Sequence, residues 1–332
     1  MKLFGFLIAT TFLCAGNAIP LVPRDNSHYV EGKSRYIWMP DADGNPFLVD
    51  LQAPVNEKII LARNGTRNRY WLFTRQNRNS PQVLLNGNAN SINNSNYIGN
   101  RPTKVITHGF NSNGNCVWIS QIKDAFLNQT DVNVIVLDWS SDAAGPLYSS
   151  VVRAVPKVGN ELAKFLNFVF NTAGGSWNNV HLVGHSLGAH VVGNTGRAVN
   201  ARAVRVTGLD PAGPAFRNDS NALNRNSGVY VEAIHTNGGQ LGINRAICHA
   251  DFYPNGGTSQ PGCDDFICSH GRAPLLFASS ITSNHLVGRL CTDLREANRN
   301  QCTGATFVLG NANLGKRGQG IYALSTRNAW PF

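Results

Sequence analysis

The sequence has 332 residues, which is long for one domain but within the range of an α/β sheet with covering helices. It carries 29 Lys and Arg against 19 Asp and Glu, a formal net charge of +10 that favours anionic surfaces over cationic partners, or simply forms a solvated basic face. The basic residues are scattered and follow no nucleic-acid-binding motif, which argues against nucleic acid as a partner.

The N-terminus has the pattern of a secretory signal peptide. Met1 and Lys2 precede an apolar run at 3–14, and small residues then lead to an expected cut after Ala18. We therefore predict a signal peptide at 1–18 and an exported, extracellular chain at 19–332 that forms a single domain, since neither repeats nor a Pro-rich linker divide it. Four Asn-x-Ser/Thr sequons are candidates for glycosylation, at Asn64, Asn93, Asn128 and Asn218.

The cysteines agree with export. Seven are present, and removing Cys14 with the signal leaves an even number suited to three disulfides in an oxidising compartment, whose connectivity the sequence leaves open. No Cys-x-x-Cys pair or clustered Cys/His spacing occurs, so we predict no metal and no cofactor.

From about residue 104 onward, the sequence patterns of strands and helices alternate. Residues 19–57 are expected to form an irregular arm with at most short strands, and the Asn-rich stretch 85–100 a loop. Apolar, β-branched and aromatic residues predict early antiparallel strands at 58–61 and 69–74. Later strands are expected at 104–107, 132–139, 180–183, 205–210 and 229–235, with helices at 118–127 and 155–170. This alternation predicts a mostly parallel sheet covered by helices on both faces, with its chemistry at the carboxyl ends of the strands.

A nucleophile is predicted where the strand at 180–183 runs into the turn Gly184-His185-Ser186-Leu187-Gly188 and then into small residues suited to a helix start. In this context Ser186 would stand on a sharp elbow, and the two glycines would leave room for the neighbouring strand and helix. A bare Gly-x-Ser-x-Gly arises easily by chance in a Gly-rich chain, so the strand and helix around it carry the prediction. The alternative is a surface serine that caps a helix.

A serine nucleophile needs a histidine to take its proton and an acid to orient that histidine. Asp210 is the predicted acid, because Pro211 ends the strand there and leaves the carboxylate at its tip. His270 is the predicted base, in a loop that a disulfide at Cys268 would hold in place. The runner-up base is His235, and the rival acids are Asp219, Asp251, Asp264, Asp265 and Asp293. The N–H groups of Leu187 and Phe110 are the predicted oxyanion-hole donors.

Four motifs occur in order: THGF at 107–110, GHSLGAH at 184–190, GLDPAGP at 208–214 and DFYPNGG at 251–257. Together they are highly specific, and residues 60–310 resemble the pancreatic lipase family. The resemblance implies an α/β-hydrolase fold with a triad of Ser186, Asp210 and His270, the residues reached independently above.

The resemblance also implies three disulfides and a lid. The family carries its lid between two cysteines just before the histidine, which implies a Cys263–Cys268 disulfide. A second bond is implied between Cys291 and Cys302, and Cys116 would then pair with Cys248. The lid itself would consist of Asp264, Asp265, Phe266 and Ile267.

The chain departs from the family in three places. Classical members add a C-terminal β-sandwich that helps colipase or surface binding, whereas this sequence stops at Phe332, so neither that domain nor colipase is expected. The stretch 223–228, which matches the family's calcium loop, has no carboxylate, so no calcium is predicted there. The lid and the loop between His235 and His249 are short, as in phospholipase A1-type and insect midgut lipase-like members.

These features predict a secreted serine carboxylic-ester hydrolase that acts on lipids at a membrane, micelle or droplet surface. A lid closed by a disulfide should leave the site open to water, with Asp264 and Asp265 at its rim to disfavour anionic head groups. The expected substrates are phosphatidylcholine-like lipids or galactolipids cleaved at the sn-1 position. The alternatives are a triacylglycerol lipase and, in another class, a catalytically silent lipid-binding or yolk-type protein, whose usual mark is a lost triad residue.

Overall fold

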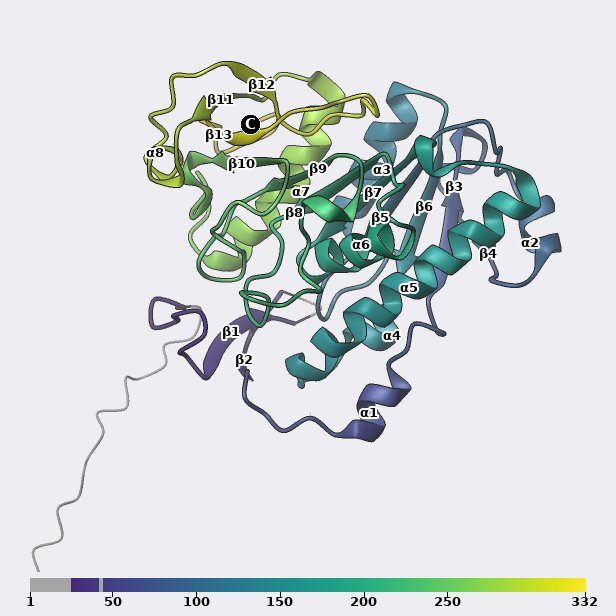
Figure 1. Cartoon of the computed structure of the whole chain (residues 1–332), viewed down its shortest axis with the longest axis horizontal. Coiled ribbons are helices and arrows are strands. Elements are labelled where there is room, and N and C mark those ends of the chain that lie inside the picture. Colours follow the sequence, from purple (N-terminus) through teal and green to yellow (C-terminus); the bar gives the residue numbers. More distant parts are fainter. Residues whose placement is uncertain (1–24, 42–43) are drawn as a thin grey trace, which may run out of the picture.

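The computed structural model describes residues 25–41 and 44–332, and within them eleven strands form one sheet (Figure 1). In spatial order the strands are β12 (Thr306–Val308), β11 (Val287–Cys291), β13 (Gly320–Leu324), β10 (Ala250–Pro254), β9 (Val231–Ile234), β8 (Arg205–Leu209), β7 (Val180–His185), β5 (Thr103–Thr107), β6 (Asn133–Asp138), β3 (Arg69–Phe73) and β4 (Gln82–Leu84). The strands from β13 to β6 pair in parallel, and the two at each edge pair antiparallel. The predicted α/β-hydrolase fold is confirmed.

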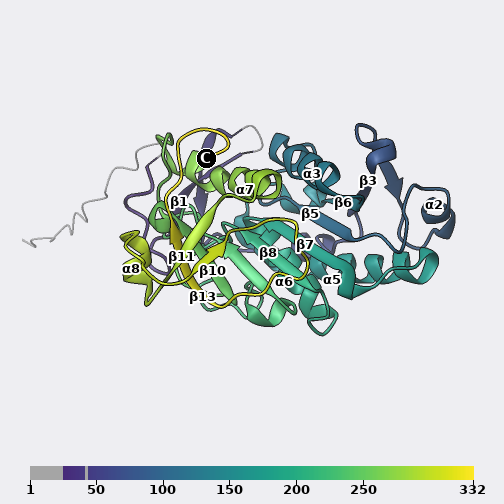
Figure 2. The ribbon, with the colours of Figure 1, turned by 90° about the horizontal axis from the view of Figure 1, so that it is seen from above.

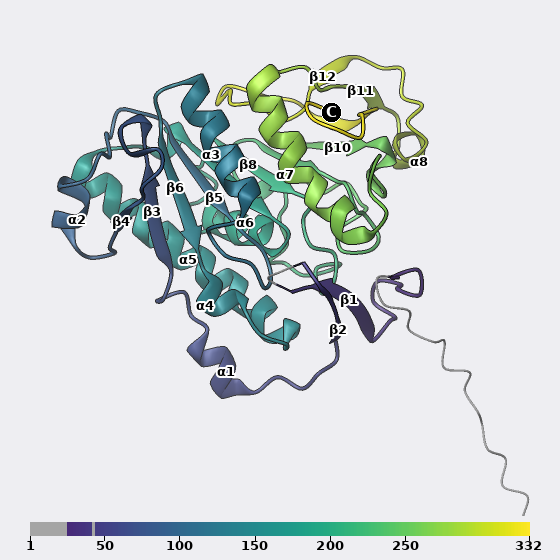
Figure 3. The same cartoon turned by 180° about the vertical axis from the view of Figure 1, so that it is seen from behind.

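Helices cover both faces of this sheet. In Figure 1, α5 (Tyr148–Ala173) and α6 (Leu187–Ala198) lie in front of the sheet. Figure 3 shows the molecule from behind, with α3 (Val117–Gln129) and α7 (Phe266–Ser283) in front of the opposite face of the sheet. Figure 2 shows the sheet between the two pairs. The shorter helices are α1 (Glu57–Ala62), α2 (Ala89–Asn93), α4 (Ser140–Ala143) and α8 (Leu294–Asn298). Single 3-10 turns lie at Arg75–Asn77, Trp177–Asn179, Arg225–Ser227 and Asn255–Gly257.

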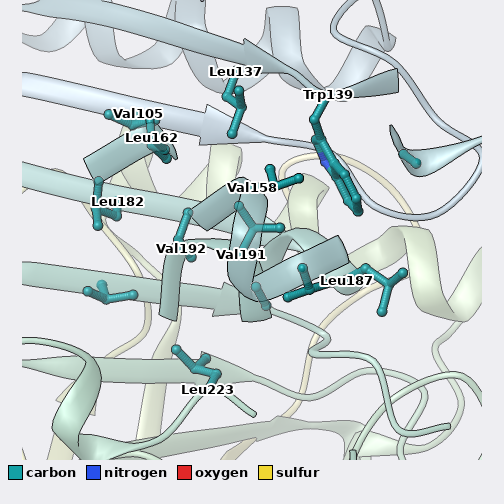
Figure 4. Close-up of a cluster of buried hydrophobic side chains, with 14 of the residues drawn as sticks. Val105, Leu137, Trp139, Val158, Leu162, Leu182, Leu187, Val191, Val192 and Leu223 are labelled. Carbon is teal, nitrogen blue, oxygen red and sulfur yellow. The ribbon is translucent and has the colours of Figure 1, made fainter. Parts of the chain in front are cut away.

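Two hydrophobic cores lie on opposite sides of the central strands. Successive residues of a strand point to opposite faces, so Val105 of β5 packs into the core under α5 and α6 while Ile106 packs into the core under α3 and α7. Leu182 and Val183 of β7 divide in the same way. Figure 4 shows the first core, in which strand residues meet Leu162 and its neighbours on the helices. Each fully buried aliphatic side chain contributes about 1.5–3 kcal/mol, which is why these strands are nearly continuously apolar.

The N-terminal arm forms an ordered hairpin. Its strands are β1 (Tyr36–Pro40) and β2 (Pro46–Asp50), which pair only with each other in the described part of the chain. The backbone of Trp38 exchanges two hydrogen bonds with the side chain of Asn26, at 2.9 and 2.8 Å. The expectation of an irregular arm with at most short strands was therefore incomplete, because the two strands pair and pack against the core under α5 and α6.

Local capping explains three differences from the expected elements. Residues 58–61 form helix α1 rather than a strand, because the Asn56 side chain accepts the N–H of Lys58 and starts a helix. The stretch at 85–100 contains helix α2, which Asn88 caps in the same manner. His270 lies within helix α7 rather than in a loop, since Asp265 caps that helix by accepting the N–H of Cys268.

Two of the three predicted disulfides are present, Cys263–Cys268 and Cys291–Cys302. The third prediction is wrong, because Cys116 and Cys248 both carry free thiols. Cys116 packs against the core under α3 and α7, whereas Cys248 is buried in the core on the other side of the sheet. Burial also raises the pKa of the Cys248 thiol well above its usual value.

The signal peptide and the glycosylation of the four sequons stay predictions. The predicted signal peptide at 1–18 lies outside the described residues, and among those described no helix has the length and hydropathy needed to cross a bilayer. The four sequon asparagines are exposed, and their glycosylation stays a prediction: Asn64, Asn93, Asn128 and Asn218.

Candidate active site

The register of three parallel strands brings the candidate residues to one edge of the sheet. Thr107 of β5 lies opposite Gly184 of β7, and Gly184 lies opposite Gly208 of β8. Parallel strands end at the same edge, so the loops that follow them meet there. Ser186 follows β7 directly and Asp210 follows β8 directly. Both residues therefore lie at the carboxyl ends of adjacent parallel strands.

Ser186 stands on a strained turn between β7 and α6. Its backbone has φ 57° and ψ −124°, a conformation that costs about 1–3 kcal/mol for a residue with a side chain and that persists where the surrounding structure enforces it. The enforcing contacts are close, since a Cβ on Gly188 would lie 2.8 Å from the carbonyl oxygen of Thr107, and one on Gly184 would lie 2.7 Å from the N atom of Ala189. Both glycines of the motif are therefore required by the elbow.

Asp210 and His270 form a buried hydrogen-bonded pair. The His270 Nδ1–H donates to Asp210 Oδ2 over 2.5 Å, and both side chains are almost wholly buried. The other carboxylate oxygen, Oδ1, accepts the backbone N–H groups of Thr236 at 2.8 Å and Asn237 at 3.0 Å. With both oxygens engaged, the carboxylate cannot rotate, and the proton on Nδ1 leaves Nε2 as the acceptor nitrogen of the imidazole.

His185 lies against the candidate base. The Nε2 atom of His185 is 3.1 Å from the carbonyl oxygen of His270, and the two ring centroids are 4.5 Å apart. Burial, followed by the charge on His270, lowers the pKa of His185 well below its ordinary value. His185 therefore stays neutral, and its Nε2–H is the donor to the His270 carbonyl.

The loop after β5 holds the predicted oxyanion donor Phe110 beside the nucleophile. A Cβ on Gly109 would lie 2.7 Å from Cβ of Ser186, so the backbone runs directly against the serine. Trp139 fixes this loop by donating its Nε1–H to the carbonyl oxygen of His108 at 2.8 Å. The other predicted donor, Leu187, begins helix α6, where first-turn N–H groups have no partner within the helix.

The runner-up base has a structural partner instead. His235 is fully buried, with Nε2 2.9 Å from Asp251 Oδ1 and Nδ1 2.8 Å from the carbonyl oxygen of Ile243. Asp251 also accepts the N–H of Cys248 at 3.0 Å. This pair ties the loop after β9 to β10 and does not line the cavity described next.

Ser186 and His270 line the same cavity. Its walls come from β1, the loop after β5, α3, α5, the elbow, the loops after β8 and β9, and α7. The lining residues are Met39, Pro40, Asp41, Gly109, Phe110, Asn111, Ser112, Trp118, Tyr148, His185, Ser186, Ala212, Pro214, Leu241 and His270. Most of these are apolar, as expected of a pocket for a hydrocarbon chain.

The predicted lid does not border this cavity. Phe266 is buried in the first turn of α7 and Ile267 packs against the core, so the two residues hold the segment down. Asp264 and Asp265 line a separate polar hollow together with Asp25. The wall of this cavity therefore contains neither Asp264 nor Asp265, because the chain after Cys263 leads into helix α7, and their expected role at the rim stays a prediction. The acidic residue among those that line the cavity of Ser186 and His270 is Asp41.

The loop that matches the family's calcium stretch is held by a guanidinium group. Arg197 donates to the carbonyl oxygens of Asn221 and Ala222, each at 3.0 Å, and to Ser227 Oγ at 2.8 Å. Within the described residues, no three His, Cys, Asp or Glu side chains converge in a way that could hold a metal ion. No role was predicted for Arg197. Its signal in the sequence was a basic residue in the last turn of a helix, close to a loop that has no carboxylate.

His190 also forms hydrogen bonds with the loops between Asp210 and Ser227. Its Nδ1 accepts the N–H of Leu223 at 2.9 Å and its Nε2 lies 2.9 Å from the carbonyl oxygen of Ala212. The ring stacks on Phe216 with centroids 3.8 Å apart. Burial lowers the pKa of His190 to about 3, so the neutral ring connects the loop that follows Asp210 to helix α6.

The chain matches known proteins over most of its length. A family model described as Lipase matches residues 42–319. Lipase member H-A of Xenopus laevis is 36% identical over 251 residues, which cover 72% of this chain and 54% of that protein. The pancreatic triacylglycerol lipase of Myocastor coypus is 33% identical over 237 residues, covering 69% of this chain and 51% of that protein. The chain thus spans about half the length of these curated relatives.

Among solved structures, Est1E from Butyrivibrio proteoclasticus matches with a TM-score of 0.30 and 15% identity, over 54% of this chain and 51% of that one. The family assignment comes from the sequence matches, which include the strands and loops that carry Ser186, Asp210 and His270. The chain belongs to the lipase family, as the resemblance of its motifs to pancreatic lipases implied.

Proposed function

We propose that this protein is a secreted serine carboxylic-ester hydrolase that cleaves acyl esters of lipids. The observation that carries the proposal is that His270, which is paired with Asp210, lines the same cavity as Ser186 on its strained elbow. The lipase relatives and the two disulfides support the class of enzyme and an oxidising compartment.

The proposed reaction proceeds through an acyl-enzyme. Ser186 Oγ attacks the ester carbonyl carbon while His270 Nε2 takes the hydroxyl proton, and Asp210 stabilises the imidazolium that forms. The N–H groups of Phe110 and Leu187 would donate to the oxyanion, and losing one such donor commonly costs about 3 kcal/mol. The tetrahedral intermediate then expels the alcohol, which receives the proton from His270. Water repeats these steps to release the fatty acid.

The proposed substrates are lipids with a zwitterionic or sugar head group, cleaved at the sn-1 position as by a phospholipase A1 or a galactolipase. The segment at 264–267 is held by the Cys263–Cys268 bond and by the buried side chain of Phe266, so it lacks the freedom of a swinging lid. The overall basic charge would attract the protein to anionic lipid surfaces.

A triacylglycerol lipase is the second candidate, favoured by the similarity to the coypu pancreatic triacylglycerol lipase. The catalytically silent alternative is the weaker one, because Ser186, Asp210 and His270 are all present and the last two are bonded to each other.

The test compares the purified full chain with Ser186→Ala. The wild type should show burst release from a p-nitrophenyl ester and the variant almost none, at an unchanged melting temperature, because Ser186 Oγ fills little volume. Initial rates on phosphatidylcholine, galactolipid and triolein then rank the substrates. If triolein is the best substrate and the rate on a short-chain ester jumps at its solubility limit, the chain is a triacylglycerol lipase. An absent burst and no labelling of Ser186 by a fluorophosphonate would favour the silent alternative.

A further inference from the structure

The β1–β2 hairpin supplies part of the cavity wall that a lid would otherwise form. We infer that this hairpin is a fixed wall of the acyl-binding cavity and that Met39 limits the length of acyl chain that the site accepts. The inference rests on the proposed ester hydrolase function and names a specificity-determining residue for it.

The alternation of the two strands decides which side chains face the molecule. Met39 pairs with Phe47 and Ile37 pairs with Val49, so all four share one face of the hairpin. Ile37 and Val49 are fully buried and Met39 is only 3% exposed. The opposite face carries the pair Trp38 and Leu48, and Leu48 is 37% exposed. The inner face of the hairpin is therefore the face that packs against the body of the molecule.

Met39 is the inner-face residue that lines the same cavity as Ser186 and His270. Apolar and aromatic residues, among them Leu241 and Tyr148, line the same cavity. A methionine side chain is long, unbranched and adaptable, and it fills an irregular apolar hollow without a polar atom that needs a partner. A larger residue at this position would occupy space that an acyl chain needs.

Contacts within the N-terminal arm fix the shape of the hairpin, and the packing of its inner face fixes its position. The two hydrogen bonds between Asn26 and Trp38 join it to the preceding segment, and Arg35 pairs with Asp50 at 2.7 Å across its open end. The ring of Phe47 lies 6.0 Å from the ring of Phe110, the residue whose N–H is a proposed oxyanion donor. The inner face thus packs on the oxyanion loop as well as on the cavity, which makes it a fixed wall rather than a flap.

The experiment compares chain-length profiles. Met39→Trp should lower kcat/KM for p-nitrophenyl dodecanoate relative to p-nitrophenyl butyrate by at least about tenfold, the range expected when one or more methylenes lose their place in a pocket. Met39→Ala enlarges the cavity, so the same ratio should stay equal to the wild-type ratio or rise. Leu48→Trp is the matched control, because it adds similar bulk on the outer face, and it should leave the ratio unchanged.

Labelling of Ser186 by a small fluorophosphonate counts the folded active sites in each sample, so rates are compared per site. A wild-type ratio in fully labelled Met39→Trp would overturn the inference, and so would an equal loss in Leu48→Trp. If Met39→Trp does not fold, a fall of the ratio in Met39→Ala overturns it instead, because removing bulk should not exclude the longer chain. A wild-type protein that neither hydrolyses the esters nor becomes labelled would refute the proposed function itself, and this inference with it.

Discussion

The Nδ1 atom of His270 lies 2.5 Å from Oδ2 of Asp210, sixty residues away in sequence. The helix that carries the histidine is packed on one face of the sheet, while the aspartate follows a central strand. Because Asp210 Oδ1 is already bound to the N–H groups of Thr236 and Asn237, only Oδ2 is available to the imidazole. The pair therefore selects one tautomer of His270.

Asp210→Asn should keep the fold and abolish most of the activity. The amide oxygen would take over the two backbone N–H groups, which turns the NH₂ group toward Nδ1 and moves the imidazole proton to Nε2. That tautomer cannot accept the serine proton, and kcat should fall by about 10⁴-fold. Stopped-flow burst kinetics measure the loss. Asp251→Asn, in the buried pair with His235, is the control, because it should alter stability but leave kcat per labelled site within about twofold. A comparable loss of kcat in both variants would contradict the assigned roles.

Gly242→Ala tests how tightly the acid is enclosed. A Cβ on Gly242 would lie 2.6 Å from Oδ2 and 2.7 Å from Cγ of Asp210, so the carboxylate must shift. A displacement of this kind should lower kcat by about 10²-fold, while the protein remains folded. Gly271→Ala is a suitable control: Gly271 adjoins His270 in helix α7, and an added Cβ there would meet no atom within 4 Å. That variant should be fully active and slightly more stable. Normal activity of Gly242→Ala would show that the acid position tolerates movement.

The candidate site could be predicted from sequence because its signals are local. The strand before Ser186, the two glycines and the small residues after it are enough to specify an elbow, and Pro211 marks the end of the strand that carries Asp210. The histidine was chosen by its order in the chain and by the disulfide expected at Cys268. The helix that contains His270 was not predicted. The cysteines at 263 and 268 suggested a loop, whereas Asp265 acts as an N-cap and starts a helix there.

Other features depend on tertiary placement that no local pattern encodes. The resemblance to the family implied a bond between Cys116 and Cys248, yet the sheet separates them. Asp264 and Asp265 were expected at the rim because the family has its lid there, whereas the short segment turns into α7 and leaves Asp41 on the cavity wall. The strands β1 and β2 are short, and their hairpin packs on residues that are far away in the sequence. Its contribution to the cavity wall therefore becomes visible only in the structure.

Arg197 leads to a prediction about metals. Its guanidinium donates to two carbonyl oxygens and one hydroxyl group of the loop at 221–227, so a positive charge already holds that loop. Activity should therefore be unchanged after dialysis against EDTA, and added calcium should have no effect. Arg197→Ala should lower the free energy of unfolding by about 1–3 kcal/mol, since hydrogen bonds from a charged donor are lost. A loss of wild-type activity in EDTA that calcium restores would contradict the prediction.

His190 makes stability depend on pH. Burial lowers its pKa to about 3 from an ordinary value of 6.5, the nearby charges of Arg197 and Arg245 add to the shift, and the hydrogen bond to the Ala212 carbonyl opposes it in part. Between these two pKa values the unfolded chain binds a proton that the folded chain does not. The contribution of His190 to stability is therefore complete above pH 6.5 and is lost progressively as the pH falls toward 3.

Urea unfolding at several pH values between 7.5 and 4.5 measures this dependence. The wild type should lose up to about 1.4 kcal/mol of unfolding free energy per pH unit below pH 6.5 through His190 alone, in addition to the losses from other groups. His190→Gln has no proton to bind, and its amide can still donate to the Ala212 carbonyl oxygen. It should be less stable than the wild type at pH 7.5, and the difference between the two proteins should shrink as the pH is lowered. Parallel pH dependences for the two proteins would show that His190 is protonated in the folded state or does not titrate differently on unfolding.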